Sequence, residues 1–251
     1  MTEGVETEKM TESRPLFGKG SRSTGRLSKG ERTKRRLLAV TRKVLAEKGY
    51  QGTRIDDITK AAEVSVGTFY LYFKNKEAIT MAVLAEVLEE GERAMLASRT
   101  ADDPFLEILE PTVCYARIVF EQAGLFRAFV QFSHIHPEAS RFWSELTSGW
   151  LERVEALMDR RLGSGRTDAS TRRVVTYAMS WMVDGVFLSF LTREHPRFQE
   201  AVQSPEQLAE TLSVLWYRAV YGTDPDPEQL ESGKKVLDFY LSDDPGGTAD
   251  Q

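Results

Sequence analysis

The placement of Gly and Pro along this chain constrains its fold more than any other feature. Between residues 29 and 241, apolar residues recur at spacings of three and four, and no stretch alternates as a strand would. These helical patterns stop at Gly124, His136-Pro137, Gly163-Ser164-Gly165, His195-Pro196, Ser204-Pro205 and Asp224-Pro225. We therefore expect an all-α fold.

Short helices are predicted near the N-terminus and longer ones after them. The first runs from about Lys29 to Gly49, the second covers Ile55–Ala62, and Ser65 can cap a third that extends through Phe73. Asn75 can cap a fourth, to Ser98. The remaining predicted helices are Pro104–Ala123, Leu125–Ile135, Pro137–Leu162, Ala169–Thr192, Pro205–Tyr221 and Pro227–Leu241.

The composition of successive segments predicts the domain organisation. Residues 1–28 are rich in Gly, Ser and Arg and lack apolar periodicity, so we expect a disordered basic arm. Residues 29–76 form a small three-helix domain, and residues 77–242 a larger helical domain. Residues 243–251 are predicted to be a disordered tail.

The charge is distributed unevenly. The whole chain carries a net charge of −5, but residues 14–76 hold 16 Lys and Arg against 5 Asp and Glu, a net of +11. A basic segment attached to an acidic body is typical of proteins that bind nucleic acid through one end.

The sequence favours a cytoplasmic protein. Cys114 is the single cysteine, which excludes an internal disulfide framework, and the first thirty residues lack an apolar signal region. No segment reaches about 18 uninterrupted apolar residues, because Asp184 breaks the best candidate. We expect no membrane contact.

Four aromatic residues are crowded into the segment 67–74, "GTFYLYFK". Phe69 and Phe73 are separated by one helical turn and are expected to be buried. Val66, Thr68, Tyr70 and Tyr72 lie largely off that face. Their hydroxyl and methyl groups suit phosphates and base edges, and the preceding pattern at 55–62 makes the pair a helix-turn-helix.

The segment 49–79, "GYQGTRIDDITKAAEVSVGTFYLYFKNKEAI", resembles the DNA-binding region of the TetR family of transcriptional regulators. The matching residues are Gly49, Tyr50, Thr53, Asp57, Ile58, Ala62, Val64, Ser65, Gly67, Thr68, Tyr70, Tyr72, Phe73, Lys76 and Glu77. Glu63 stands where the family usually has Gly, so a left-handed backbone is expected there at a cost of about 1 kcal/mol.

The resemblance implies a function and a set of contacts. It implies a regulator without enzymatic activity, more readily a repressor than an activator, which binds a palindromic double-stranded DNA operator as a homodimer and responds to a small molecule. The predicted DNA-binding residues are Thr53, Arg54, Ser65, Val66, Gly67, Thr68, Tyr70, Tyr72 and Lys76. The basic arm, with Arg14, Lys19, Arg22 and Arg26, would add contacts to DNA. The alternative is a helical small-molecule-binding or adaptor protein without specific DNA binding.

Aromatic residues gather again in the larger domain. Most such residues are simply core, but some are expected to line a cavity for an apolar or aromatic effector. Asp184 needs a partner if it is buried, or it faces the effector. The predicted effector-binding residues are Phe120, Phe129, Phe132, Trp143, Trp150, Trp181 and Asp184.

Two helices carry stripes that suit packing against a second copy of the chain. One stripe comprises Ala178, Met182, Gly185 and Ser189; the other comprises Leu208, Leu212, Leu215, Trp216 and Ala219. Packing within the chain is the alternative use of both.

No cofactor or metal site is expected. His134 and His136 would point apart on a helix, and no Cys/His framework of zinc spacing accompanies them. The chain also lacks a Gly-rich phosphate loop, a nucleophile motif and a His-Glu-x-x-His helix, which argues against an enzyme.

Overall fold

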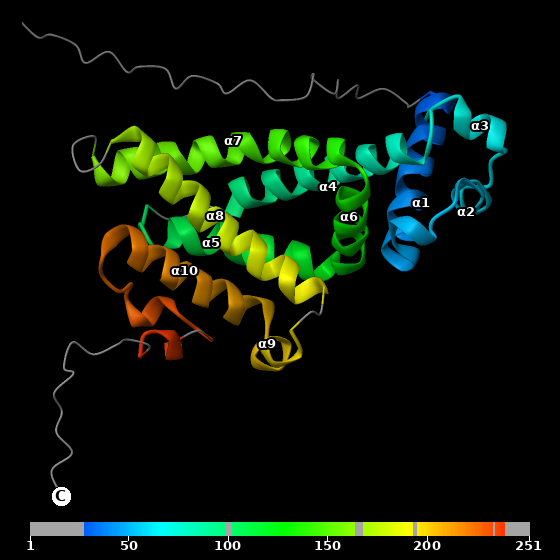
Figure 1. Ribbon diagram of the computed structural model, residues 1–251. Coiled ribbons are helices and arrows are strands. Elements are labelled where there is room, and N and C mark those ends of the chain that lie inside the picture. Colours follow the sequence, from blue (N-terminus) through cyan, green and yellow to red (C-terminus); the bar gives the residue numbers. More distant parts are fainter. Residues whose placement is uncertain (1–27, 99–101, 164–167, 193–194, 233, 239–251) are drawn as a thin grey trace, which may run out of the picture.

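Helices account for all the regular structure in the described part of the chain (Figure 1). The computed structural model describes residues 28–98, 102–163, 168–192, 195–232 and 234–238. The predicted arm and tail, apart from Ser28, lie outside these ranges. The helices are α1 (Lys29–Gly52), α2 (Ile55–Ala61), α3 (Val66–Tyr70), α4 (Lys76–Ser98), α5 (Leu106–Glu121), α6 (Ala123–Ile135), α7 (Pro137–Leu162), α8 (Ala169–Thr192), α9 (Pro196–Ala201) and α10 (Pro205–Tyr221).

The all-α prediction is confirmed, and several helix ends fall where the capping residues predicted. The predicted caps are confirmed: Ser65 Oγ accepts the Thr68 N–H at 3.1 Å and Asn75 Oδ1 accepts the Ala78 N–H at 2.9 Å. At the break predicted before Pro205, Ser204 Oγ accepts the Gln207 N–H at 3.0 Å. One predicted end was wrong, because helix α3 ends at Tyr70 rather than Phe73, and the short helix α9 was not predicted.

The prediction of a helix at Pro227–Leu241 was also wrong. The described part of this segment forms two short 3₁₀ turns, Pro227–Gln229 and Lys234–Val236. Side chains of α10 take up backbone groups that a helix would pair internally: Glu210 accepts the Ser232 N–H at 2.8 Å, and Arg218 donates to the Val236 carbonyl at 3.0 Å. Leu230 is buried against Phe105, which anchors this irregular segment.

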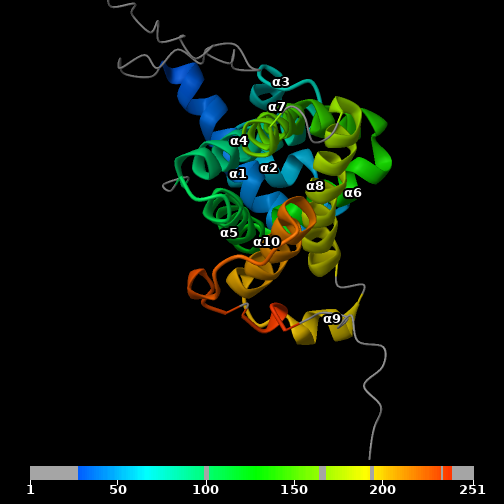
Figure 2. The ribbon, with the colours of Figure 1, turned by 90° about the vertical axis from the view of Figure 1, so that its left-hand side faces the viewer.

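The helix-turn-helix stands at one end of the molecule, and α4 runs from it into the larger domain (Figure 1). In the larger domain α5 packs against α4 and α10, while α7 packs against α8 and α4 (Figure 2). Helix α1 lies along α6, which makes the most extensive contact between the two domains.

One hydrophobic core continues through both domains. Its members come from α1 to α4 on one side and from α6 and the first turn of α7 on the other: Leu37, Leu38, Leu45, Tyr50, Ile58, Ala62, Phe69, Phe73, Ile79, Val83, Leu84, Val87, Leu125, Ala128, Phe129, Phe132 and Ala139. The helix-turn-helix therefore does not have a core of its own, and its position is set by α6.

Two glycines permit the close approach of α1 to α6. Gly49 has φ 69° and interrupts the helical conformation of α1, and a Cβ there would lie 2.6 Å from Gln131 Oε1. That same oxygen accepts the Tyr50 N–H at 3.0 Å. At Gly124 a Cβ would lie 2.3 Å from the Ala46 carbonyl oxygen, a distance that no side chain can occupy.

Helix α8 is long and apolar enough to cross a membrane by length and composition alone. Only 17% of its most apolar window is buried within the chain. It nevertheless packs against α5, α6 and α7 through Phe187, Leu191 and Thr176.

We expect Gly124→Ala to destabilise the protein by about 1–3 kcal/mol, because the added methyl group overpacks the contact between α1 and α6. Urea unfolding measures this change. Gly91→Ala is the matched control, since its Cβ would meet only Ile118 Cδ1 at an ordinary 3.7 Å. That variant should be as stable as wild type or more stable. Equal stability of Gly124→Ala and wild type would contradict the described packing.

Candidate functional site

Ser65 shapes the start of α3, the second helix of the helix-turn-helix. Its Oγ accepts the Thr68 N–H at 3.1 Å and lies 2.9 Å from Thr68 Oγ1. The turn before it contains Glu63 at φ 52°, which confirms the left-handed backbone that the sequence predicted. The two hydroxyl groups are thus tied to the helix end, where free backbone amides also point outward.

Helix α3 has one buried face and one exposed face. Phe69 is fully buried, and Phe73 is 6% exposed after the helix ends. On the opposite face Val66 is 42% exposed and Tyr70 54% exposed, with Gly67 beside them. The division of aromatics between core and surface agrees with the sequence prediction.

The remaining predicted contacts of this region differ in exposure. Arg54 is exposed at the start of α2, and its N–H donates to Asp57 Oδ2 at 2.9 Å. Tyr72 is half-buried and packs on the domain core. Sequence reasoning missed Leu71, which is 80% exposed at the end of α3. An apolar residue so exposed beside Tyr70 could have been noticed from its position off the Phe69 face.

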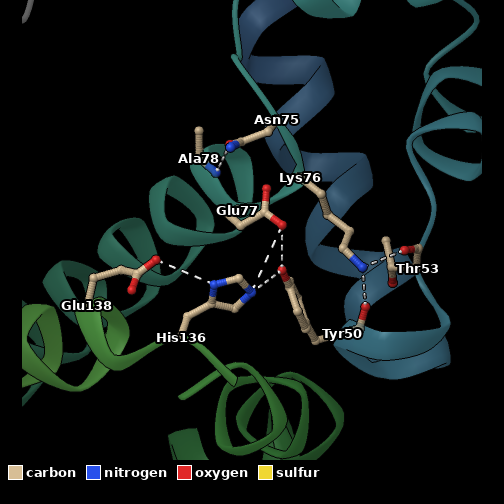
Figure 3. A network of polar contacts seen from close by, with 8 residues as sticks. All are labelled: Tyr50, Thr53, Asn75, Lys76, Glu77, Ala78, His136 and Glu138. Carbon is tan, nitrogen blue, oxygen red and sulfur yellow. Dashed lines mark hydrogen bonds and ion pairs between the residues drawn. The ribbon is translucent and has the colours of Figure 1, made fainter. Parts of the chain in front are cut away.

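Thr53 and Lys76 are corrections to the predicted DNA-binding set (Figure 3). Thr53 is 1% exposed, and its hydroxyl donates to the Gly49 carbonyl at 2.7 Å. Lys76 Nζ donates to the carbonyl oxygens of Tyr50 and Thr53, both at 3.0 Å, and lies over the Tyr50 ring. Both side chains hold the end of α1 and are not available as primary DNA contacts.

Tyr50 is the centre of a polar network between the two domains (Figure 3). Its hydroxyl donates to Glu77 Oε1 at 3.0 Å and lies 2.9 Å from His136 Nε2. His136 Nδ1 in turn lies 3.4 Å from Glu138 Oε1. Burial, followed by the hydrogen bond to Glu77, raises the pKa of Tyr50 above its ordinary range. Hence Tyr50 stays a neutral hydrogen-bond donor at physiological pH.

A cavity of about 240 Å³ lies in the larger domain between α4, α5, α7 and α8. Its lining is mostly apolar and aromatic. The lining residues are Leu88, Glu92, Met95, Glu107, Ile108, Pro111, Thr112, Tyr115, Trp143, Ser144, Thr147, Trp150, Leu151, Val154, Leu157, Tyr177, Ser180, Trp181, Val183, Asp184 and Trp216.

The structure brings together four of the residues predicted to bind an effector. Trp143 and Trp150 reach the cavity from α7, and Trp181 and Asp184 from α8. The sequence reasoning did not assign Tyr115 or Trp216 to the lining. Tyr177 was not assigned either, although its spacing from Trp181 and Asp184 marks a common helical face.

Phe120, Phe129 and Phe132 are corrections, because none of them lines this cavity. Phe132 is fully buried against the Tyr50 ring, with the two ring centres 4.7 Å apart. Phe129 stacks on Trp143, and Phe120 stacks on Phe190. Phe129 and Phe132 of α6 belong to the core that the two domains share.

Asp184 is held in the cavity wall by Tyr115, whose hydroxyl donates to the carboxylate. Burial raises the pKa of Asp184 to about 6, and the Tyr115 hydrogen bond opposes this rise. The other two acidic lining residues have cationic partners: Glu92 pairs with Arg153, and Glu107 accepts from Arg161 Nε at 3.0 Å. In the described residues no group of His, Cys, Asp and Glu is arranged to hold a metal ion.

An exposed apolar row runs along α8. It consists of Val174, Ala178, Trp181 and Gly185, at spacings of three and four, with Val174 69% and Trp181 65% exposed. Of the stripe predicted on α8, Ala178 and Gly185 belong to this row, and Met182 and Ser189 are half-buried beside it.

The prediction that the stripe on α10 packs against a second copy was wrong for most of its residues. Leu208, Leu212 and Trp216 are buried inside the chain, where α10 packs against α5 and α8, so they cannot face a partner. Ala219 is exposed, and Leu215 is half-buried.

Asp184→Asn should stabilise the protein by about 1–3 kcal/mol at pH 7.5, because the raised pKa makes the ionised carboxylate costly in the folded state. The native pKa of about 6 lies above the ordinary 3.8. The stability that protonated Asp184 contributes is therefore complete below pH 4 and lost as the pH rises through 6. The gain from Asn should accordingly vanish near pH 4. Urea unfolding at the two pH values tests this, with the exposed Glu152→Gln as control; a wild type at least as stable as Asp184→Asn at pH 7.5 would contradict it.

Comparison with known proteins places these features in a family. Residues 37–83 match the family model described as bacterial regulatory proteins, tetR family. Over 193 residues the chain is 24% identical to the HTH-type transcriptional regulator EthR of Mycolicibacterium smegmatis, with 75% of this chain and 86% of the relative covered. Over 67 residues it is 40% identical to the HTH-type transcriptional repressor DhaR of Mycobacterium sp. (strain GP1), covering 27% of this chain and 33% of DhaR.

The fold is shared along most of the chain. The transcriptional regulator FadR from Bacillus subtilis, solved in complex with stearoyl-CoA, superposes with a TM-score of 0.59 at 20% identity, covering 75% of this chain and 98% of FadR. The matched helix-turn-helix and the long alignment with EthR show that residues 37–83 form a TetR-family DNA-binding domain, in a chain that resembles TetR-family transcriptional regulators and shares their fold along most of its length.

Proposed function

We propose that the protein is a repressor that binds a palindromic DNA operator as a homodimer and leaves it when an apolar or aromatic effector enters the cavity. The observation that carries this proposal is the two-sided helix α3. Phe69 fixes it in the core, while Val66, Gly67 and Tyr70 face outward, where a major groove would lie.

The exposed groups of α3 suit direct contact with DNA. The Tyr70 hydroxyl can bond a phosphate or a base edge, and the Val66 methyl groups can touch a thymine methyl. Gly67 allows the DNA backbone to approach the helix start. Arg54 is exposed on the neighbouring helix and would add attraction that does not depend on sequence.

Helix α4 provides the link between DNA and effector. It begins at Lys76 in the network around Tyr50 and reaches the cavity through Leu88, Glu92 and Met95. A ligand that displaces these residues would shift the helix that holds the helix-turn-helix. Preferential binding to the DNA-incompetent arrangement by a few kcal/mol is enough to change operator occupancy.

The homodimer is proposed to form along α8. An exposed row of Val174, Ala178, Trp181 and Gly185 leaves space for close helix packing, since a Cβ on Gly185 would meet nothing within 4 Å. A partner copy would cover this row, so α8 does not require a membrane to bury it. A cytoplasmic regulator of this kind presents two α3 helices to successive major grooves.

Selection from random duplex DNA at physiological salt should recover a palindrome with half-sites about one helical turn apart. Tyr70→Ala should weaken binding to the selected duplex by about 1–3 kcal/mol while leaving the thermal unfolding midpoint unchanged. Ile135→Ala, which also removes an exposed apolar side chain, should bind like wild type. Binding without sequence preference would instead support a helical ligand-binding or adaptor protein.

Ala178→Arg should raise the dimer dissociation constant by about tenfold or more, because it places an unpaired charge in the centre of the α8 row. Sedimentation equilibrium measures this constant. Ala156→Arg is the matched control on an exposed position of α7 and should leave it unchanged. A dimer that tolerates Ala178→Arg would mean that α8 is not the interface.

A further inference from the structure

The charges that line the cavity are all of one sign. Glu92, Glu107 and Asp184 belong to the wall, whereas no Lys, Arg or His occurs among its described lining residues. Glu92 and Glu107 form ion pairs with Arg153 and Arg161, neither of which is among the lining residues. Asp184 therefore dominates the electrostatic character of the open space.

Asp184 has acceptor capacity to spare. In the described part of the chain its contact is the Tyr115 hydroxyl, and no ion pair is formed with it. A carboxylate offers about four lone-pair sites, of which one hydrogen bond occupies a single site. At pH 7.5 the group is mostly ionised, since its pKa is about 6. The wall thus holds a negative charge in largely apolar surroundings without a counter-charge.

Aromatic rings accompany this carboxylate on both walls. Tyr177 and Trp181 lie on the same face of α8 as Asp184, with the two rings edge to face at 5.7 Å. Trp143 and Trp150 enter the cavity from α7, two turns apart. The faces of Trp and Tyr attract cations, most strongly where water is excluded.

We propose that the effector is an apolar organic cation, an amine or quaternary ammonium on an aromatic or alkyl body, whose charge is countered by Asp184. The tryptophans bind the apolar body, and the Tyr115 hydroxyl keeps the carboxylate directed into the cavity. This inference rests on the proposed function, because it assigns the chemical class of the effector that the cavity takes.

The same wall disfavours anions. A free carboxylate or phosphate group would face Asp184 without a cationic partner, and burying an unpaired charge is costly. A neutral ligand would leave the ionised Asp184 without a counter-charge. A cation removes both costs.

The test uses three ligands with one carbon skeleton: phenylbutylamine, phenylbutanol and phenylbutyrate. Binding to the full-length protein at pH 7.5 is measured by calorimetry, and release of the selected duplex is followed in parallel by fluorescence anisotropy. We expect the amine to bind at least about tenfold more tightly than the alcohol, and the carboxylate most weakly, since one tenfold step is 1.4 kcal/mol. Asp184→Asn should abolish the preference for the amine while retaining the alcohol, and Glu152→Gln should leave the preference intact.

Each outcome bears on one of the two proposals. Equal or tighter binding of the alcohol or carboxylate by wild type, absence of binding by all three, or an unchanged amine preference in Asp184→Asn would overturn the cation inference. Release of DNA by the alcohol at a lower concentration than the amine requires would also overturn the cation inference, while leaving the effector-responsive repressor in place. Binding of the amine without release of DNA would support the cation site and contradict the switch.

Discussion

The docking of α1 on α6 is the contact on which the rest of this molecule depends. At Gly124 the helix backbone approaches the Ala46 carbonyl more closely than any side chain allows. At Gly49 the chain leaves the helical conformation so that Gln131 can accept the Tyr50 N–H. Because the helix-turn-helix shares its core with α6, its orientation is a property of the larger domain. In the switch that we propose, a shift of α6 or α4 would therefore move α3 with it, because these helices share one core.

Tyr50 adds hydrogen bonds of defined geometry to this packing. It is apolar enough to sit in the shared core beside Phe132, and its hydroxyl engages Glu77 and His136 at the junction of α4 with α6 and α7. Such a network has a defined geometry, whereas apolar contacts tolerate sliding. The ammonium of Lys76 closes the other side by holding the last carbonyls of α1. The start of α4 is thus held to the end of α1 by Glu77, which bonds the Tyr50 hydroxyl, and by Lys76, which bonds the carbonyls of Tyr50 and Thr53.

How far the sequence predicts the structure depends on whether a residue's role is local. The long helices, the caps at Ser65 and Asn75, and the burial of Phe69 and Phe73 follow from spacing within one segment, and these were predicted. The role of Lys76 depends on how close the start of α4 lies to the end of α1, and Thr53 bonds the Gly49 carbonyl at that same end, so the family pattern misled the prediction for both. Phe129 and Phe132 belong to the core that the two domains share rather than to the cavity wall, a choice that composition cannot reveal. The irregular segment 227–238 is held by Glu210 and Arg218 of α10. Helix propensity within the segment does not reveal such contacts with another helix.

Trp181 belongs both to the cavity wall and to the exposed row on α8. In the dimer that we propose, a partner helix would close that side of the cavity. Effector affinity and subunit association then become linked quantities, and each changes the other by the same factor. At low protein concentration the chain would be monomeric, its cavity would be open on that side, and it would bind the effector more weakly. The amount of regulator in a cell would thereby set the effector concentration at which it responds.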